Sequence, residues 1–478
     1  MKLGQILSGV ETGYDTLEVS ALALDDREVS AGSLFFCVTG FSRDGHDFAQ
    51  SAVDRGAVAL VVERKLDIDV PQVVVDSVRH RMGSAADQFF GEPSSELKVI
   101  GVTGTNGKTT SAYLVAHLLT SAGIDCGLIG TVETIVAGQR VEAVRTTPEA
   151  IGLQSLFRRM LDGGDQAAAI EVSSHALDLG RVDGTRFAAS IFTNLTQDHL
   201  DWHGSMEDYW ASKRRLFTDL PCGVPIVNID DSHGRALVTD LSSSISVGLG
   251  EGADWRATSL TTDLGGATFE LVSPLGVASV RTRLPGKFNV VNSLGAAAAA
   301  SVLGVELDAI VAGLESAPGV PGRFEPVELG QPFAVLVDYA HTPDSLENVL
   351  RAARNIAGGR VLCVVGCGGD RDASKRPLMG GIASELADFA VLTSDNPRSE
   401  DPEEILRQVA AGATGEVEVC VDRRDAIQMA LNEASEGDVV LIAGKGHEQG
   451  QEFADGLKVP FDDRVVALEL LGEAGWAL

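Results

Sequence analysis

The chain of 478 residues is long enough for about three domains, each with its own core. Its 38 basic residues are outnumbered by 68 acidic ones, and the net charge of −30 excludes the basic surface that nucleic acid or an anionic membrane requires. With scattered cysteines, no signal peptide in residues 1–10 and no apolar run near ~18 residues, we expect a cytoplasmic protein with free thiols and no membrane insertion.

Residues 1–95 form the first predicted unit. Apolar runs predict strands at 34–38, 57–62 and 70–75, and helices are expected at 46–55 and 77–90. The polar loop 39–46 is punctuated by glycine and could hold a ligand, although an ordinary turn has the same composition. Residues 91–95 are predicted to be a linker.

The second predicted unit, residues 96–322, opens with a β-branched run at 98–102, a glycine-rich loop and a helix at 111–122. That order predicts a phosphate cradle, in which backbone N–H groups and the helix N-terminus face an anion. Lys108 would reach the outer phosphates, and the Thr109 hydroxyl could bind magnesium. The flanking strand and helix favour a nucleoside triphosphate site over a coincidental glycine-rich turn.

Two later strands of this unit, at 167–172 and 188–194, carry Glu171 and lead to His199. Ligands of parallel sheets lie beyond the carboxyl ends of the strands, so both side chains should lie beside the cradle as candidate magnesium ligands. A purely structural role for His199 in its loop remains an equal alternative.

A helix is predicted at 205–217, with Ser205 and Asp208 forming a capping box. Lys213 has aromatic residues one turn before it and apolar residues one turn after it, which places it on the apolar face. Two interpretations stay open. The side chain could extend its ammonium group to solvent, or it could be a desolvated, chemically reactive amine with a lowered pKa.

The rest of the chain continues the α/β alternation. A hairpin is expected from strands 267–272 and 277–284, and an alanine-rich helix should run to residue 303. In the third unit, residues 323–478, strands are predicted at 334–337, 360–365, 389–393, 417–421 and 439–442. Each is followed by a polar cluster, and together these should form a second ligand-binding wall: Asp338-Tyr339-Ala340-His341, Gly366–Arg371, Asp395-Asn396-Pro397-Arg398, Asp422-Arg423-Arg424 and Gly444-Lys445-Gly446-His447-Glu448.

Several of these motifs together resemble the Mur ligases of peptidoglycan synthesis. They are Gly104-Thr105-Asn106-Gly107-Lys108-Thr109, Glu171-Val172-Ser173-Ser174-His175, Thr193–His199, the helix carrying Lys213, Phe288-Asn289, Gly322-Arg323 and Asp338–His341. The clusters at 395–398 and 444–448 are similar to those of members that add meso-diaminopimelate to UDP-N-acetylmuramoyl-L-alanyl-D-glutamate. The resemblance covers the whole chain. It implies a small N-terminal α/β UDP-sugar-binding domain (1–95), a central parallel-sheet P-loop ATP-binding domain (96–322) and a C-terminal Rossmann-like amino-acid-binding domain (323–478).

The resemblance also implies a reaction. ATP would phosphorylate the D-glutamyl γ-carboxylate, and the diaminopimelate amine would attack the acyl phosphate to give the amide, ADP and phosphate. Lys108, Glu171, His199 and Lys213 would be the catalytic set, with Mg²⁺ held by Thr109, Glu171 and His199 and a second Mg²⁺ by Lys213 carboxylated on its amine. The expected partners are the three small-molecule substrates, and a monomer is expected.

The implied binding residues fall into three groups. For ATP they are Gly104, Thr105, Asn106, Gly107, Lys108, Thr109, Thr110, Asn289, Arg323, Asp338 and His341. For the UDP-muramoyl dipeptide they are Leu24, Asp26, Phe41, Ser42, Arg43, Thr146, Thr147, Ser173 and Arg181. For diaminopimelate they are Arg371, Asp395, Asn396, Pro397, Arg398, Gly444 and Glu448. The chain departs from the family pattern at Asp26, where serine is usual and a carboxylate would lie near the diphosphate, and at Leu179, where glutamine is common.

Selectivity for diaminopimelate would follow from charge. Arg398 could hold a carboxylate bidentately and Glu448 an ammonium group, whereas lysine would leave the arginine unpaired at a cost of several kcal/mol. The alternatives are a lysine-adding relative, a ligase of the folylpolyglutamate synthetase type, and a non-catalytic protein gated by nucleotide.

Overall fold

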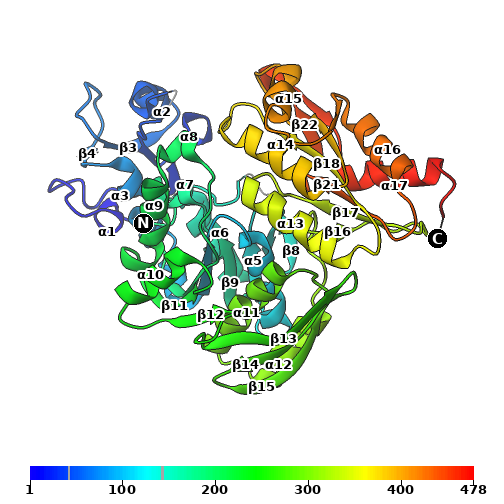
Figure 1. Cartoon of the computed structure of the whole chain (residues 1–478). Coiled ribbons are helices and arrows are strands. Elements are labelled where there is room, and N and C mark those ends of the chain that lie inside the picture. Colours follow the sequence, from blue (N-terminus) through cyan, green and yellow to red (C-terminus); the bar gives the residue numbers. More distant parts are fainter. Residues whose placement is uncertain (41–42, 142–144, 478) are drawn as a thin grey trace.

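The computed structural model describes residues 1–40, 43–141 and 145–477, and its described part forms three α/β units, each built around its own sheet (Figure 1). The predicted α/β class with parallel sheets is confirmed. Phe41 and Ser42 lie outside the described residues. Among the described residues, no helix is both long and apolar enough to cross a membrane.

The first unit contains a four-stranded, fully parallel sheet in the order β1-β2-β3-β4. Its elements are α1 (Leu3–Ile6), β1 (Ala21–Ala23), η1 (Asp26–Glu28), β2 (Ser33–Phe36), η2 (Gly45–Phe48), α2 (Ala49–Asp54), β3 (Ala57–Val62), β4 (Gln72–Val74), α3 (Val78–Phe89) and α4 (Pro93–Glu96). Residues 91–95, predicted as a linker, are more ordered than that prediction implied: Pro93 starts the short helix α4 and is buried with Ser94. A proline is pre-organised for the first position of a helix.

The central unit is built on an eleven-stranded sheet in the order β15-β14-β13-β12-β11-β10-β5-β9-β6-β7-β8. The strands from β13 to β6 run parallel, and antiparallel hairpins extend both ends. Its elements are β5 (Lys98–Thr103), α5 (Lys108–Ser121), β6 (Cys126–Ile129), β7 (Thr134–Val136), β8 (Gln139–Val141), α6 (Ala150–Gly163), β9 (Ala167–Glu171), α7 (Ser174–Asp178), β10 (Phe187–Phe192), α8 (Leu200–His203), α9 (Met206–Thr218), β11 (Cys222–Asn228), α10 (Ser232–Asp240), β12 (Ile245–Gly248), β13 (Trp255–Asp263), β14 (Gly266–Ser273), β15 (Gly276–Thr282), α11 (Lys287–Val302) and α12 (Leu307–Ser316).

Helix α5 begins at Lys108, three residues earlier than predicted, because Gly107 caps it in the left-handed region at φ +85°. A side chain is excluded at both glycines of the preceding loop. A Cβ at Gly104 (φ +149°) would lie 1.9 Å from Thr193 Oγ1, and one at Gly107 would lie 2.4 Å from Asn292 Oδ1. Glycine therefore allows the loop to pack directly against its neighbours.

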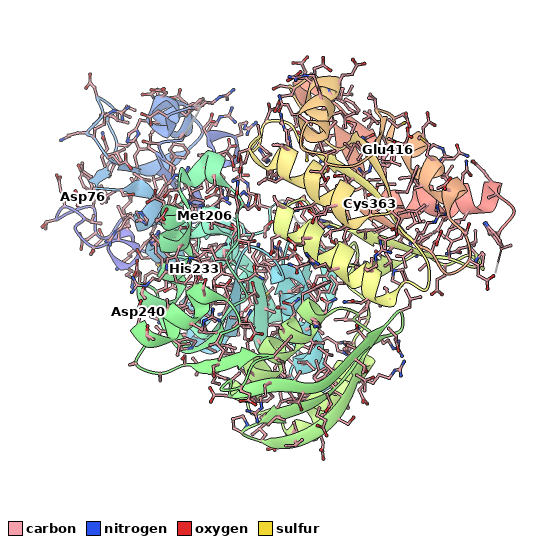
Figure 2. All side chains as sticks on the ribbon, viewed as in Figure 1. Asp76, Met206, His233, Asp240, Cys363 and Glu416 are labelled. Atoms are coloured by element: carbon pink, nitrogen blue, oxygen red, sulfur yellow. The ribbon has the colours of Figure 1, made fainter. Side chains whose placement is uncertain are left out.

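The third unit has a six-stranded sheet in the order β16-β17-β21-β18-β19-β20, parallel except for β16. Its elements are β16 (Glu325–Pro326), β17 (Ala334–Asp338), α13 (Pro343–Ile356), β18 (Val361–Cys367), α14 (Lys375–Leu386), β19 (Phe389–Ser394), α15 (Pro402–Ala410), β20 (Glu418–Cys420), α16 (Arg423–Glu433), β21 (Val439–Ala443), the hairpin β22 (Gly450–Glu452) and β23 (Lys458–Pro460), η3 (Ala454–Gly456) and α17 (Asp463–Glu473). Cys363 is buried in this sheet (Figure 2), and all six cysteines are free thiols, as predicted.

Contacts from the loops of the central sheet hold the third unit in place. Asn106 Nδ2 donates to Asp344 Oδ2 at 2.8 Å, and Arg323 Nη2 donates to Thr109 Oγ1 at 3.0 Å. Gln197 Nε2 donates to Ser374 Oγ at 3.1 Å. The two units therefore meet at the carboxyl ends of the central strands, where ligands of such sheets bind.

Asp87 generates a testable prediction about stability. Burial raises the pKa of this carboxyl in α3 to about 6, and its Oδ1 accepts no hydrogen bond among the described residues. The Asp87 carboxyl ionises near pH 4 in the unfolded chain and near pH 6 in the folded chain. Its ionisation therefore lowers the free energy of unfolding as the pH rises through that range. We expect Asp87→Asn to stabilise the protein by about 2 kcal/mol at pH 7.5 but not at pH 4.

Thermal unfolding from pH 4 to 7.5 measures the effect, and Asp67→Asn, which removes an exposed carboxylate from the same unit, is the control. A difference between wild type and Asp87→Asn that stays constant over this pH range would contradict the prediction.

Candidate active site

A cavity of about 330 Å³ lies between the central and third units, beyond the ends of β5, β9, β10 and β17. Most of the predicted nucleotide and metal residues line it, and so do two of the predicted UDP-substrate residues. Those lining it are Thr105, Asn106, Gly107, Lys108, Thr109, Thr110, Thr146, Glu171, Ser173, His199, Lys213, Asn289, Arg323, Asp338 and His341. The cavity is also lined by residues to which the sequence analysis gave no role, among them Thr131, Asp198, Tyr209 and Asp344.

The loop Gly104–Thr109, here called the phosphate loop, is held from the end of β10. Asn194 accepts from Thr105 N through its carbonyl and from Asn106 N through Oδ1, both at 2.9 Å. Lys108 Nζ donates to Gly104 O at 3.0 Å and to Thr105 O at 2.8 Å. Burial lowers the pKa of Lys108.

Oxygen donors meet beside this loop. Thr109 Oγ1 donates to Glu171 Oε2 at 3.0 Å, and Thr131 N donates to Glu171 Oε1 at 2.7 Å. Glu171 is 1% exposed. In the described part of the chain, no three His, Cys, Asp or Glu side chains come close enough to hold a metal by themselves. A hydroxyl and a carboxylate suit Mg²⁺, which takes further oxygens from phosphates and water.

Asp198 lies at the centre of a second cluster of ionisable side chains. Its Oδ2 lies 3.4 Å from His199 Nε2 and 3.8 Å from His341 Nε2, and its Oδ1 lies 3.8 Å from Lys375 Nζ. Burial would raise the pKa of Asp198, but these neighbours outweigh burial and hold it below its usual value. Burial lowers the pKa of His199 to about 3, so its imidazole is neutral at neutral pH and free to bind a metal.

Lys213 is fully enclosed beneath the phosphate loop. It is 1% exposed, its Nζ donates to Gly104 O at 2.8 Å, and the same atom lies 4.5 Å from the centre of the Tyr209 ring. Burial, with the nearby charge of Lys108, lowers the pKa of Lys213 well below the usual range. The interpretation of a solvent-reaching lysine is wrong, and the site holds a desolvated amine.

The predicted nucleotide residues of the third unit gather around Tyr339, and Asn289 of α11 lines the same cavity. The Arg323 guanidinium lies 4.4 Å from the Tyr339 ring centre. Asp338 Oδ2 accepts from Phe324 N at 2.6 Å, and burial raises the pKa of Asp338 to about 6. His341 Nδ1 lies 2.7 Å from Tyr339 O. Asn289 Nδ2 donates to Pro285 O at 2.8 Å.

The residues predicted for the UDP substrate form two groups. In the central unit, Thr147 Oγ1 donates to Glu171 O at 2.8 Å, and Arg181 Nη1 donates to Thr147 O at 3.3 Å. Ser173 caps α7, and Thr146 Oγ1 is 3.0 Å from Thr131 Oγ1.

Within the described ranges, no hydrogen bond or ion pair joins that group to Leu24, Asp26 or Arg43 in the first unit. Asp26 Oδ2 accepts from Ser51 Oγ at 2.8 Å and lies 3.8 Å from Arg55 Nε, so its charge has partners of its own. Sequence reasoning missed Arg79 and Arg145, which with Arg181 surround Glu149 at N–O distances of 3.8, 2.8 and 2.9 Å.

Most of the residues predicted for diaminopimelate meet in the third unit, together with two that were missed. Asp395, Asn396, Arg398, Lys445, Glu448 and Glu452 form a cluster of hydrogen bonds and ion pairs, which we call the amino-acid pocket after its predicted role. Lys445 Nζ, fully buried, donates to Asn396 Oδ1 and Glu448 Oε2 at 3.0 Å each.

Further contacts join this pocket to its surroundings. Asn396 Nδ2 donates to Glu448 Oε2 at 2.8 Å, and Arg398 Nε donates to Glu452 Oε2 at 3.1 Å. Pro397 lies between Asn396 and Arg398, and Gly444 N donates to Asp338 O at 3.0 Å. Arg371 is exposed, and its Nη1 donates to Asp370 O at 2.9 Å, so the structure leaves it outside this network.

A buried ion pair fixes the spacing of the two loops that form the pocket. Arg423 and Asp463 are both fully buried and joined by two contacts of 2.7 Å. Arg423 also donates to Ser394 O at 3.4 Å and to Ala443 O at 3.0 Å. These carbonyls end β19 and β21, directly before Asp395 and Gly444, so the pair braces both loops.

Comparisons with known proteins match this architecture along the chain. Residues 18–90 match the profile described as "Mur ligase family, catalytic domain", residues 102–300 match "Mur ligase middle domain", and residues 322–446 match "Mur ligase, glutamate ligase domain". The UDP-N-acetylmuramoyl-L-alanyl-D-glutamate–2,6-diaminopimelate ligase of Geobacillus kaustophilus is 48% identical over 96% of both chains.

Two solved structures extend the comparison. A UDP-N-acetylmuramoyl-L-alanyl-D-glutamate–2,6-diaminopimelate ligase matches at a TM-score of 0.72, with 34% identity over 99% of both chains. The folylpolyglutamate synthase of Mycobacterium tuberculosis, solved with ADP and AMPPCP, shares the fold at a TM-score of 0.63, with 19% identity over 76% of this chain and 92% of its own. The profile matches and the identity over nearly the whole length lead to one conclusion: this chain belongs to the Mur ligase family.

Proposed function

We propose that this protein is an ATP-dependent ligase that joins meso-diaminopimelate to the D-glutamyl γ-carboxylate of UDP-N-acetylmuramoyl-L-alanyl-D-glutamate. One observation carries the proposal. Tyr339 lines the cavity with the phosphate loop, and its hydroxyl reaches Glu448 Oε1 of the amino-acid pocket at 3.5 Å. A site that phosphorylates a carboxylate thus adjoins a site suited to an amino acid. The 48% identity to a diaminopimelate ligase favours this over the folylpolyglutamate synthetase type.

ATP binds with its phosphates on the phosphate loop. The N–H groups at the start of α5 and the Lys108 ammonium face the β- and γ-phosphates, and Arg323 neutralises charge from the third unit. Asn289, Asp338 and His341 contact the nucleoside, with Asp338 suited to the ribose hydroxyls. Phosphoryl transfer depends on such positioning and charge neutralisation more than on a nucleophilic side chain.

Thr109, Glu171 and His199 are the residues of this chain that would hold Mg²⁺, and the donor set fits, because two hard oxygens and a neutral imidazole lie beside the phosphate loop. When bound, the ion supplies positive charge that stabilises the transferring phosphoryl group. Lys213 fits carboxylation, since a neutral buried amine adds CO₂ to give a carbamate and a proton. The carbamate oxygens would serve a second Mg²⁺.

The UDP-muramoyl dipeptide extends from Thr146, Thr147, Ser173 and Arg181 toward the first unit, where Leu24, Asp26, Phe41, Ser42 and Arg43 are the proposed uridine-diphosphate contacts. After γ-carboxylate phosphorylation, with the amino acid held by Asn396 and Glu448, its unprotonated amine attacks the acyl carbon and gives up a proton to solvent. The tetrahedral intermediate then collapses with release of phosphate. Arg371, Asp395, Pro397, Arg398 and Gly444 complete the proposed amino-acid contacts. We further propose a cytoplasmic monomer.

Phosphate release tests the function directly. With ATP, Mg²⁺ and UDP-N-acetylmuramoyl-L-alanyl-D-glutamate, we expect phosphate release that depends on meso-diaminopimelate and is at least about tenfold slower with L-lysine. Mass spectrometry of the product checks the amide bond. ATP binding without phosphate release would favour the non-catalytic alternative, and turnover with a folate and glutamate would favour the folylpolyglutamate type.

Lys213→Ala should reduce turnover by at least about 1,000-fold, because the carbamate oxygens are lost. Short carboxylates such as formate should restore part of the activity, and the intact wild-type mass in bicarbonate should exceed the sequence mass by one CO₂. The matched control is Arg214→Ala, which changes the partly exposed neighbour on the same helix and should keep full activity. An unmodified Lys213 in active protein would contradict carboxylation.

Arg398→Ala should raise the KM for diaminopimelate by about 50-fold and leave the KM for ATP within about twofold, because a charge-assisted contact to the amino acid is lost. Steady-state kinetics with each substrate varied in turn measure both constants. Arg407→Ala, an exposed change in the same unit, is the control. Equal rises in both KM values would count against the proposed role of Arg398.

A further inference from the structure

The side chain of Arg398 already has an anionic partner inside the chain. Its Nε donates to Glu452 Oε2 at 3.1 Å, and its Nη1 donates to Gly369 O at 2.6 Å. Backbone hydrogen bonds keep the two residues side by side. Arg398 N donates to Glu452 O and Glu452 N donates to Asn396 Oδ1, both at 3.0 Å. Glu452 therefore lies directly against the two residues proposed to contact the amino acid.

This pairing changes the charge balance on which selectivity depends. A guanidinium has five N–H groups, so the remaining ones can still bind a ligand carboxylate while Glu452 stays in place. Two carboxylates on one guanidinium repel each other, and the alternative is that the ligand displaces Glu452. In either case Glu452 weakens the binding of a ligand that carries a second carboxylate.

Lysine has the opposite relation to this residue. It has no second carboxylate, so without Glu452 it would leave Arg398, whose side chain is only 21% exposed, with no anionic partner, at a cost in free energy. With Glu452 present, the arginine keeps its partner when lysine is bound. The pocket then contains the carboxylates of Asp395, Glu448 and Glu452 against the cations of Lys445 and Arg398, a balance that tolerates an extra ammonium group.

We infer that Glu452 is a specificity-determining positioning residue: by pairing with Arg398 it competes with the second carboxylate of the ligand, and so it reduces the preference of the pocket for diaminopimelate over lysine. The inference rests on the proposed function and concerns the amino-acid substrate of the same site. Glu452 lies on β22, part of the separate two-stranded hairpin and not of the main sheet, so its side chain can change without disturbing a strand of that sheet.

The test compares wild type, Glu452→Gln and Glu452→Ala, with meso-diaminopimelate and L-lysine each measured as substrate or as competitor. We expect the KM for diaminopimelate to fall about fivefold in Glu452→Gln and at least as far in Glu452→Ala, with the KM for ATP unchanged. Lysine should bind no better, so the ratio of kcat/KM for the two amino acids should rise about fivefold or more. A purely structural role would instead weaken both amino acids together.

Asp455→Asn is the matched control, because it removes one carboxylate from the exposed turn of the same hairpin and should leave the ratio unchanged. Thermal unfolding checks that all variants fold. An unchanged or reduced ratio in both Glu452 variants would overturn the inference while leaving the proposed function intact. Failure of the wild-type protein to couple either amino acid would overturn both.

Discussion

Two lysines, Lys213 buried and Lys108 partly exposed, share one carbonyl oxygen, and the proposed chemistry of the site depends on this arrangement. The Nζ atoms of Lys108 and Lys213 both donate to Gly104 O, at 3.0 and 2.8 Å. Two ammonium groups so close together repel each other, so the neutral form of one is favoured. Lys213, buried against Tyr209, is the one whose pKa falls furthest below its usual range. Carboxylation would turn that repulsion into attraction.

The fold brings the reacting groups together because parallel strands end at one edge of a sheet. Thr109 and His199 follow strands β5 and β10 of the central sheet, Glu171 ends β9, and Asp338 ends β17 of the third unit. The two loops of the amino-acid pocket likewise follow the carboxyl ends of parallel strands, β19 and β21 of the third sheet. Arg423 and Asp463 brace both loops. Burying such a pair adds little stability, and its value lies in fixing geometry.

Local patterns in the sequence were sufficient to predict much of the site. The order of strand, glycine-rich loop and helix predicted the position of Lys108. The spacing of apolar residues around Lys213 predicted that it lies on an apolar face. Its full burial depends on the packing of α9 under the phosphate loop, which the sequence does not show. The early start of α5 was missed because the capping role of Gly107 comes from its left-handed backbone.

Pairings between distant residues could not be predicted. Arg398 and Glu452 are far apart in sequence, as are Arg423 and Asp463, and a single sequence gives no signal that such residues meet. The expectation that lysine would leave Arg398 without a partner was therefore incomplete, because it omitted Glu452. Lys445 was visible within a polar cluster, yet its contact with Asn396 depends on the neighbouring order of β21, β18 and β19.

The hydrogen bonds from Asn106 to Asp344 and from Arg323 to Thr109 connect the phosphate loop itself to the third unit. A ligand that changes the donors and acceptors of this loop must also change the energy of the contact between the units. Thermodynamic linkage makes the effect reciprocal, so the factor by which a bound ligand changes the equilibrium of this contact is also the factor by which the contact changes the affinity for that ligand. Under the proposed function, nucleotide binding at the phosphate loop would therefore be linked to how closely the central and third units meet.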